Sequence, residues 1–519
     1  MLRLITKFSN KYPKVFPMNK RRGFLQTVAG IAGIGSGGAV TAPWLLASTG
    51  ALVSQPAAAE SSGGQIGKAE GQTQTAAEFS SKLRFEDIPV DVVQIAKASI
   101  IDSLATQIYG AQLPWSKMIA QYVMANQCGG KSRIMGMRNA LTSAPYAALC
   151  NGAFAHAFEL DNLTKPNSGS HPGATVLTAA LATAQNQSKP VSGKDLLTAF
   201  IAGTEIMIRV GRATQHSQEV HGFHAPGTTG PFGAAVGSSR ILNLSAQQTQ
   251  MAIAIAASTT SGLLEFAKAG NGGMVKRLHL GRAAESGVMA ANLASQGFTG
   301  PTTALEGEFG FIKVFCRDYD LNQLTLGLGS VWLTKTVMIK RYACHITAHT
   351  PVEASLKIKD ENKLKGEDIE SIEIQTTDRA VRVNNIAQPK DILIGQYSIP
   401  FCVALAFYRN PVDPRSFDES AIKDSNIMGL AKRVQMRALP PPGNSSDMSS
   451  IVTVRLKDGR SFTEEISAFL GTPERPMGHA ELRDKFLMLT SDDGKAKTQE
   501  TFIRLLNLEN EKSVNWIGA

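Results

Sequence analysis

Apolar residues recur every three or four positions through most of the chain from Phe85 to about residue 335. Pro89 is placed to begin a helix, and Val92, Ile95 and Leu104 follow it at helical spacing. Because these stretches are rich in Ala, Gly and Ser, we expect closely packed helices in one large helical domain over residues 81–335. The other helices predicted there cover residues 114–125, 144–158, 173–187, 193–214, 229–241, 245–264 and 281–296.

The pattern changes after about residue 335. The stretch IESIEIQTT (369–377) alternates apolar and polar residues as a half-buried strand does. Residues 451–466 predict two strands joined by a Lys-Asp-Gly-Arg turn. Helical spacing returns after Gly478. We therefore predict a mainly α protein with an α+β second domain at 336–475 and a helical tail at 476–519 that rejoins the helical domain.

The N-terminal segment is typical of an exported protein. Residues 1–59 hold seven Lys or Arg and no acidic residue, so most of the formal net charge of +10 lies there. KRRGFLQ (20–26) resembles the twin-arginine export motif, and Ala57-Ala58-Ala59 suits a signal peptidase. The sequence predicts a signal peptide over 1–59, a flexible leader over 60–80, a periplasmic protein and no stable membrane insertion after signal cleavage.

Several classes of protein are disfavoured. The rest of the chain has no Lys/Arg-rich run with interleaved aromatic residues, so nucleic acid is not expected as a partner. The glycines at 33–38 match G-x-G-x-x-G, but they lie inside the signal and outside any βαβ unit, which argues against a dinucleotide cofactor. The five cysteines are widely spaced and form no C-x-x-C, so neither a disulfide framework nor a zinc ribbon is predicted.

One polar loop interrupts the small-residue helices. HAFELDNLTKPNSGSHPG (156–173) carries the candidates Glu159, Asp161, Thr164 and His171 between two apolar stretches. A solvated connection is the simplest interpretation of such a segment. Its carboxylates and histidine are also groups that transfer protons.

Four further segments carry candidate chemistry. HGFHAPGTTG (221–230) places His224 just before a helix N-terminus, which favours anions, although a capping turn is an equal alternative. Lys276 opens a basic helix in AGNGGMVKRLHLGRAA (269–284). KRYACHITAH (340–349) contributes Lys340 and His345, and GQYSIPF (395–401) contributes Tyr397. Together these cations predict a site for a small polyanionic molecule.

Metal binding is not predicted. His345 and His349 have the spacing of a zinc-binding pair, but the glutamate of H-E-x-x-H is missing between them. A hydrolase of the Ser-His-Asp type is also disfavoured because no G-x-S-x-G motif is present.

Most of the chain after residue 80 resembles the MmgE/PrpD family. The resemblance rests on five motifs that follow one another in the order found in the family: HAFELDN with HPG, GFHAPGTTG, MVKRLHLGRAA, KRYACH with TAH, and QYSIPF. The resemblance implies a large helical domain, a smaller α+β lid-like domain, an active site between them, a homodimer and no metal or organic cofactor. It departs from the family at Asn162, where relatives commonly carry a second aspartate. The residues that it implies are Asp161, His171, Lys276, His345 and Tyr397 for catalysis and His224, Lys340 and Thr164 for substrate binding, with Glu159 as a weaker candidate.

The resemblance also implies a lyase that acts on a small di- or tricarboxylate, by dehydration or decarboxylation, through proton exchange beside a carboxylate. Epimerisation or isomerisation begins with similar proton chemistry and is an alternative. Two non-catalytic alternatives are a periplasmic polycarboxylate-binding protein and, because of Asn162, a pseudo-enzyme with a structural role.

Overall fold

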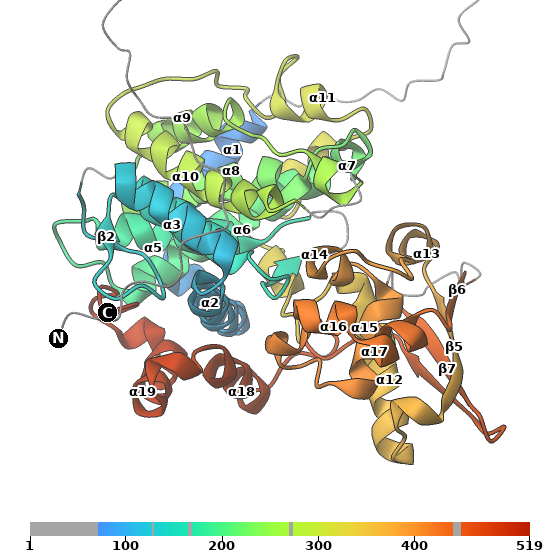
Figure 1. Ribbon diagram of the computed structural model, residues 1–519. Coiled ribbons are helices and arrows are strands. Elements are labelled where there is room, and N and C mark those ends of the chain that lie inside the picture. The colour runs from blue at the N-terminus through green and yellow to red at the C-terminus, as the bar shows by residue number, and fades with distance from the viewer. Residues whose placement is uncertain (1–70, 127–128, 165–168, 269–272, 440–447) are drawn as a thin grey trace, which may run out of the picture. The chain divides into compact units, whose positions relative to one another are not determined.

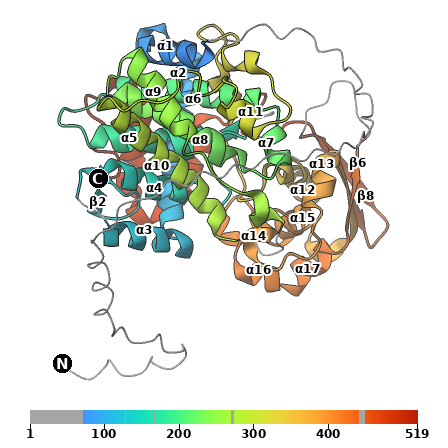
Figure 2. The same cartoon turned by 90° about the horizontal axis from the view of Figure 1, so that it is seen from above.

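The computed structural model describes residues 71–126, 129–164, 169–268, 273–439 and 448–519. All of them belong to one compact unit, Ile66–Ala519 (Figures 1 and 2). The predicted signal peptide at 1–59 lies outside the described residues, as does the leader up to residue 70. Within the described residues, every helix is too short or too polar to cross a membrane.

The leader prediction is wrong for residues 72–80, because Gln72–Lys82 form helix α1. Its small residues Thr73, Ala76, Ala77 and Ser80 are buried at helical spacing, although the segment is polar overall. The hydroxyl of Thr73 donates to the buried carboxylate of Glu306. A buried stripe of small side chains, of which two are alanines and two carry hydroxyl groups, therefore anchors this helix, and hydrophobicity alone does not reveal it.

The predicted helices of the first part are confirmed, with shifts at their ends. The prediction over 245–264 is too long, because the helix ends at Ala257. The helices are α2 Val90–Ala111, α3 Pro114–Asn126, α4 Ala144–Ala155, α5 Thr178–Gln185, α6 Gly193–Ala213, α7 Ser217–Val220, α8 Ala225–Ile241, α9 Ala246–Ala257, α10 Val275–Ser295 and α11 Phe311–Phe315.

Glycines and alanines let α4, α8 and α10 pack closely at the centre of this part. A Cβ added to Gly287 of α10 would lie 2.3 Å from Cβ of Ala234 on α8. A Cβ on Gly281 would lie 2.3 Å from the carbonyl oxygen of Leu149 on α4. Neither contact leaves room for a larger side chain, so the small-residue composition is a requirement of this core.

The second part contains the predicted strand and hairpin. Its four-stranded sheet has the order β6-β5-β7-β8, in which only β5 and β6 run parallel. Helices α12 and α15 pack against the sheet (Figures 1 and 2). The elements are β5 Ile369–Thr376, β6 Val434–Ala438, β7 Ser450–Leu456, β8 Ser461–Ile466, α12 His349–Asn362, α13 Asp378–Asn384, α14 Ile392–Gly395, α15 Ile399–Tyr408, α16 Glu419–Lys423 and α17 Ser425–Ala431. The protein is thus mostly helical, with a small mixed sheet in its C-terminal half.

Two features join the second part to the first. Strand β3 (Leu163–Thr164) pairs antiparallel with β4 (Val337–Met338), so the polar loop after α4 lies beside the start of the second part. The tail forms α18 (His479–Leu489) and α19 (Lys495–Leu506), and both pack against α2. Within the first part, a separate small ribbon pairs β1 (Ser132–Arg133) with β2 (Leu141–Thr142).

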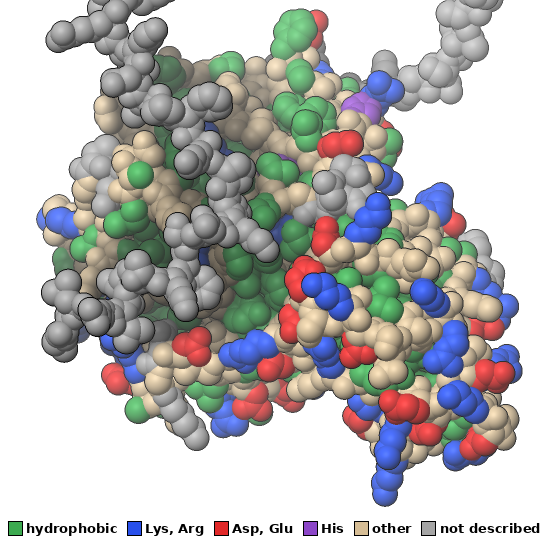
Figure 3. Space-filling view, in the orientation of Figure 1, with side chains coloured by type: hydrophobic (Ala, Val, Ile, Leu, Met, Phe, Trp, Pro, Cys, Tyr) green, Lys and Arg blue, Asp and Glu red, His purple; other side chains and the backbone are tan. Residues whose placement is uncertain are grey.

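The surface differs between the two parts. Figure 3 shows hydrophobic side chains gathered on the helical part in this view, whereas acidic and basic side chains are spread over the α+β part. The charged groups that carry the candidate chemistry are instead buried, as Glu159, Lys276 and Lys340 show.

Candidate active site

The polar loop predicted at 156–173 folds into the interior instead of running over the surface. Asp161 and Asn162 are fully buried, and His171 is 7% exposed. Glu159 adopts a left-handed backbone conformation with φ of 56°, which turns the chain sharply before Asp161. The solvated-connection interpretation is therefore wrong for the described residues of this loop.

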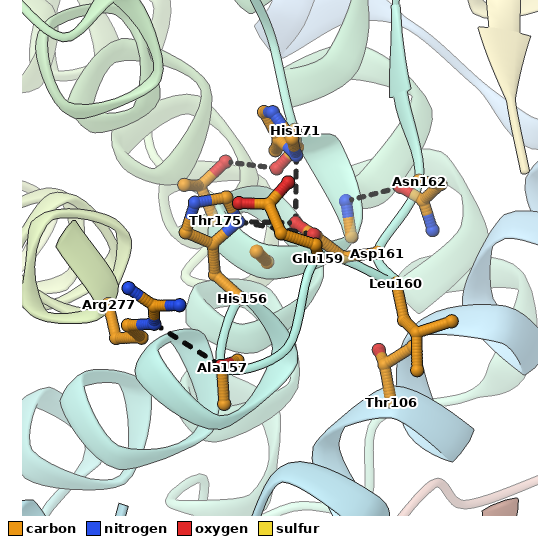
Figure 4. A network of polar contacts seen from close by, with 12 residues as sticks. Thr106, His156, Ala157, Glu159, Leu160, Asp161, Asn162, His171, Thr175 and Arg277 are labelled. Atoms are coloured by element: carbon orange, nitrogen blue, oxygen red, sulfur yellow. Dashed lines mark hydrogen bonds and ion pairs between the residues drawn. The ribbon is translucent and has the colours of Figure 1, made fainter. Parts of the chain in front are cut away.

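Asp161 lies between two histidines (Figure 4). Its Oδ2 is 2.8 Å from Nδ1 of His171 and 2.9 Å from Nδ1 of His156. Since an ionised carboxylate only accepts hydrogen bonds, both rings donate their Nδ1–H to it. Nε2 then stays without a proton on each neutral ring.

The electrostatics of this trio favour an ionised aspartate. Burial opposes ionisation, but His156 and His171 outweigh it and hold the pKa of Asp161 well below its ordinary value. Burial lowers the pKa of His156 well below its ordinary value, against the pull of Asp161 and with the help of Lys276. His156 is therefore a neutral ring near neutral pH.

A second cluster surrounds Glu159. Its Oε2 lies 2.9 Å from Nζ of Lys340, its Oε1 contacts Nζ of Lys276, and the hydroxyl of Tyr397 donates to Oε1 across 3.3 Å. The residues of this cluster come from three regions of the chain. Glu159 lies on the loop after α4, Lys276 lies at the start of α10, and Lys340 and Tyr397 belong to the second part. Burial, followed by Arg277 and Lys340, lowers the pKa of Lys276 well below its ordinary value. The contact with the Glu159 carboxylate acts in the opposite direction and favours the charged forms of both lysines, so that one carboxylate holds two buried ammonium groups side by side.

His224 is the last residue before α8, as the sequence predicted, and its ring lies close to the trio. Its ring centroid is 6.0 Å from that of His156. Its Nδ1 lies 3.1 Å from Nδ1 of His279 on α10. Burial, then His279 and His171, lower the pKa of His224 well below its ordinary value.

These groups line one cavity of about 450 Å³. Seven of the eight residues predicted for catalysis or substrate binding contribute to its wall, and Asp161 is the exception, since it lies behind His156 and His171. His345 is positioned by Thr347 through a 2.8 Å contact at Nδ1 and lies 5.0 Å from the Tyr397 ring. The candidates in the wall are Thr164, His171, His224, Lys276, Lys340, His345 and Tyr397.

His156 and His279 were not among the residues predicted from the sequence, and Glu159 was predicted only as a weaker candidate. His156 stands in the same motif as Asp161, five residues earlier, and a pairing across that turn was a signal available in the sequence. Nε2 of His156 is buried without a hydrogen-bond partner among the described residues. Glu159 carries the lysine pair, so it is a central residue of the cavity wall.

Asn162 belongs to a different network. Its Nδ2 donates to Oδ2 of Asp102 at 2.9 Å and to the carbonyl of Ser99 at 3.0 Å, and its Oδ1 accepts from the backbone of Gly173 at 3.0 Å. Lys485 of α18 binds the other oxygen of Asp102 at 2.5 Å. The missing second aspartate is therefore replaced by an amide with a structural role, away from His171.

Carboxylate and imidazole groups such as the trio also hold divalent metals. His156, Asp161 and His171 bring their potential ligand atoms within 4.8 Å of one another. However, the nitrogen–oxygen distances of 2.8 to 3.1 Å are those of direct hydrogen bonds. We interpret the trio as a hydrogen-bonded acid–base group.

Both parts of the chain match domain models of one protein family. Residues 74–324 match the model of the MmgE/PrpD N-terminal domain, and residues 342–508 match that of the MmgE/PrpD C-terminal domain. The chain is 29% identical to a cis-aconitate decarboxylase of Aspergillus terreus over 83% of this chain and 92% of that protein. It is 28% identical to the human cis-aconitate decarboxylase over 81% and 88%, and 26% identical to that of Mus musculus over 78% and 83%.

The network of Asn162 predicts that Asn162→Asp destabilises the protein. The change removes both donors of the amide and places a carboxylate against Asp102, which should cost about 2 kcal/mol or more. Urea denaturation measures the loss. The matched control is Asn426→Asp at the exposed start of α17, which should change stability by less than about 0.5 kcal/mol. Equal stability of Asn162→Asp and the wild type would contradict the network.

The buried neutral histidines predict a loss of stability in mild acid. The pKa values of His156 and His224 are lower in the folded protein than in the unfolded chain, so unfolding takes up protons below about pH 6.5. Stability should therefore fall from pH 7.5 to pH 5.5 by about 1 kcal/mol for each histidine. Denaturation curves at both pH values measure this, and His224→Gln should show a smaller drop than the wild type.

Proposed function

The chain belongs to the MmgE/PrpD family, and we propose that it is a cofactor-independent lyase that decarboxylates a small tricarboxylate of the cis-aconitate class. The observation that carries the proposal is the pair of buried ammonium groups, Lys276 and Lys340, beside the His156–Asp161–His171 trio. The relatives that cover most of the chain support this reaction type, since they are named cis-aconitate decarboxylases.

Substrate binding follows from the charges of the cavity. Each ammonium group has three N–H donors, and Glu159 accepts from one on each lysine. Among the described residues, Glu159 is the hydrogen-bonding partner of both Nζ atoms, so the remaining donors of Lys276 and Lys340 can bind substrate carboxylates. Charge-assisted hydrogen bonds of this kind are strong in a buried site, where solvent does not compete.

We assign the protonation of carbon to His171. When the bond to the departing carboxylate breaks, its electron pair passes into the remaining carbon skeleton, and the neighbouring carboxylate stabilises it as an enolate. The lysines lower the energy of that negative charge. A proton then adds to carbon, so one CO2 leaves and one C–H bond forms. The imidazolium form of His171, stabilised by the buried carboxylate of Asp161, supplies this proton.

Dehydration is the second candidate, because Tyr397 places a hydroxyl group beside Glu159 and Lys276, where it can assist a leaving hydroxide. Epimerisation requires the same proton exchange without loss of a group. A binding protein would capture the acid unchanged. Incubation with a panel of di- and tricarboxylates separates these four: mass spectrometry detects loss of CO2 or water, chiral analysis detects epimerisation, and a binder gives only a thermal shift.

Replacement of His171 by Ala should reduce turnover of the true substrate by about 100-fold or more, because the general acid/base is removed. Steady-state kinetics with the acid identified by the panel measures the effect. The control is His479→Ala at the exposed start of α18, which should leave turnover unchanged. A reduction below about threefold would exclude His171 from proton transfer.

Export to the periplasm is also proposed, on the evidence of Arg21-Arg22 in KRRGFLQ. Replacement of both arginines by lysine should leave the protein in the cytoplasm of a bacterial host, because the twin-arginine pathway reads that pair. Cell fractionation and immunoblotting measure the distribution. Unchanged export of the double variant would refute this route. The homodimer implied by the resemblance stays a prediction.

A further inference from the structure

His224 and His279 meet through the same ring nitrogen. Their Nδ1 atoms are 3.1 Å apart, a hydrogen-bond distance. A neutral imidazole has one N–H and one bare nitrogen, so one Nδ1 donates and the other accepts. The tautomer of either ring therefore fixes the tautomer of the other.

The surrounding chain holds both rings in place. The backbone N–H of His224 donates to the carbonyl of Gly262 at 3.0 Å. Gly262 has φ of +129°, and a Cβ there would lie 3.2 Å from Nδ1 of His279. The Phe266 ring packs edge-on against both, with centroids 5.2 Å from His224 and 5.9 Å from His279. The pair is thus fixed by packing before any ligand arrives.

Both rings are uncharged near neutral pH. Burial lowers the pKa of His279 to about 4, and Lys276 adds to the effect. For His224, burial, His279, His171 and Arg277 all lower the pKa and only Asp161 opposes them. An uncharged His224 can bind a carboxylate only through an N–H on its cavity side.

His171 and His224, which both line the cavity, have different groups behind them. Nδ1 of His171 faces Asp161, which only accepts, so the neutral ring keeps a bare Nε2. Nδ1 of His224 faces His279, which can donate. His224 lines the cavity and His279 does not, so the edge of His224 that carries Nε2 is turned towards the cavity.

We propose that His279 is a positioning residue that donates its Nδ1–H to His224, so that His224 presents Nε2–H to a substrate carboxylate. His171 has a bare Nε2 when it is neutral, and this nitrogen takes up the proton that the imidazolium form then delivers to carbon. The two histidines thereby divide anion binding and proton transfer between them. The identity of the bound acid rests on the proposed function, whereas the tautomers of the pair do not.

The first test reads the tautomers directly. Nitrogen-15 NMR of the protein labelled at its histidines distinguishes Nδ1–H from Nε2–H, and His224→Gln and His279→Asn assign the signals. In the citrate-saturated wild type, His224 should be the Nε2–H tautomer and His279 the Nδ1–H tautomer. In His279→Leu, the bare Nδ1 of His224 should lose its hydrogen-bond shift. An Nδ1–H tautomer of His224 in the wild type would overturn the proposal.

The second test separates binding from chemistry. His279→Leu should raise KM for cis-aconitate about tenfold and change kcat less than threefold, because it weakens one hydrogen bond to a charged group. His279→Asn, whose amide keeps an N–H donor near the same place, should recover most of the loss. His479→Leu at the exposed start of α18 is the matched control.

An unchanged KM in folded His279→Leu, or no recovery in His279→Asn, would overturn the proposal. If the wild type converts no acid in the panel, the proposed lyase function fails, and calorimetric Kd values for citrate replace KM in the same comparison. The NMR result stands in either case, so the two failures are distinguishable.

Discussion

The contact of Glu159 with Lys276 and Lys340 is the interaction on which the site depends. A buried ammonium group without a partner is very costly, and two of them side by side repel each other. Glu159 offsets both costs with one carboxylate. Because Lys276 belongs to α10 and Lys340 to the second part, the cavity is complete only when both parts have packed around the loop after α4.

The loop that carries Glu159 is held from behind by a network that reaches the C-terminal tail. Lys485 of α18 donates to the carbonyl of Leu160 at 3.0 Å and to that of Lys340 at 2.6 Å, as well as to Asp102. All three N–H groups of its ammonium are therefore used. The tail helix thus fixes the backbone on both sides of the Glu159–Lys340 contact, which explains why a segment so distant in sequence bears on the site.

The two carboxylates of the site, Asp161 and Glu159, mainly hold other side chains of the protein in place. Asp161 holds two rings in one tautomer, and Glu159 holds two ammonium groups in place. The cavity wall carries imidazoles, ammonium groups and a phenol, and Glu159 lies among them. A cavity whose ammonium groups and imidazoles are held in place by carboxylates of the protein suits a polyanion that must exchange a proton.

The sequence by itself determined many of the helices and strands and the types of chemical group available to the site. Helical spacing, strand alternation and the Lys-Asp-Gly-Arg turn are local signals, and they predicted the helices, β5 and the β7–β8 hairpin. Motif order predicted the family. Most of the candidate residues came from segments whose polar groups interrupt apolar stretches, which is a pattern visible along the chain.

Only the tertiary structure decided which polar residues support others and which face the cavity. It buried α1 through small side chains, turned Asn162 to Asp102, and set His156 and His279 behind or beside the predicted residues. These assignments depend on contacts between residues far apart in sequence, such as Lys485 with Leu160. A residue type and its spacing define what a side chain is able to do, but its partner in space determines its protonation and its role.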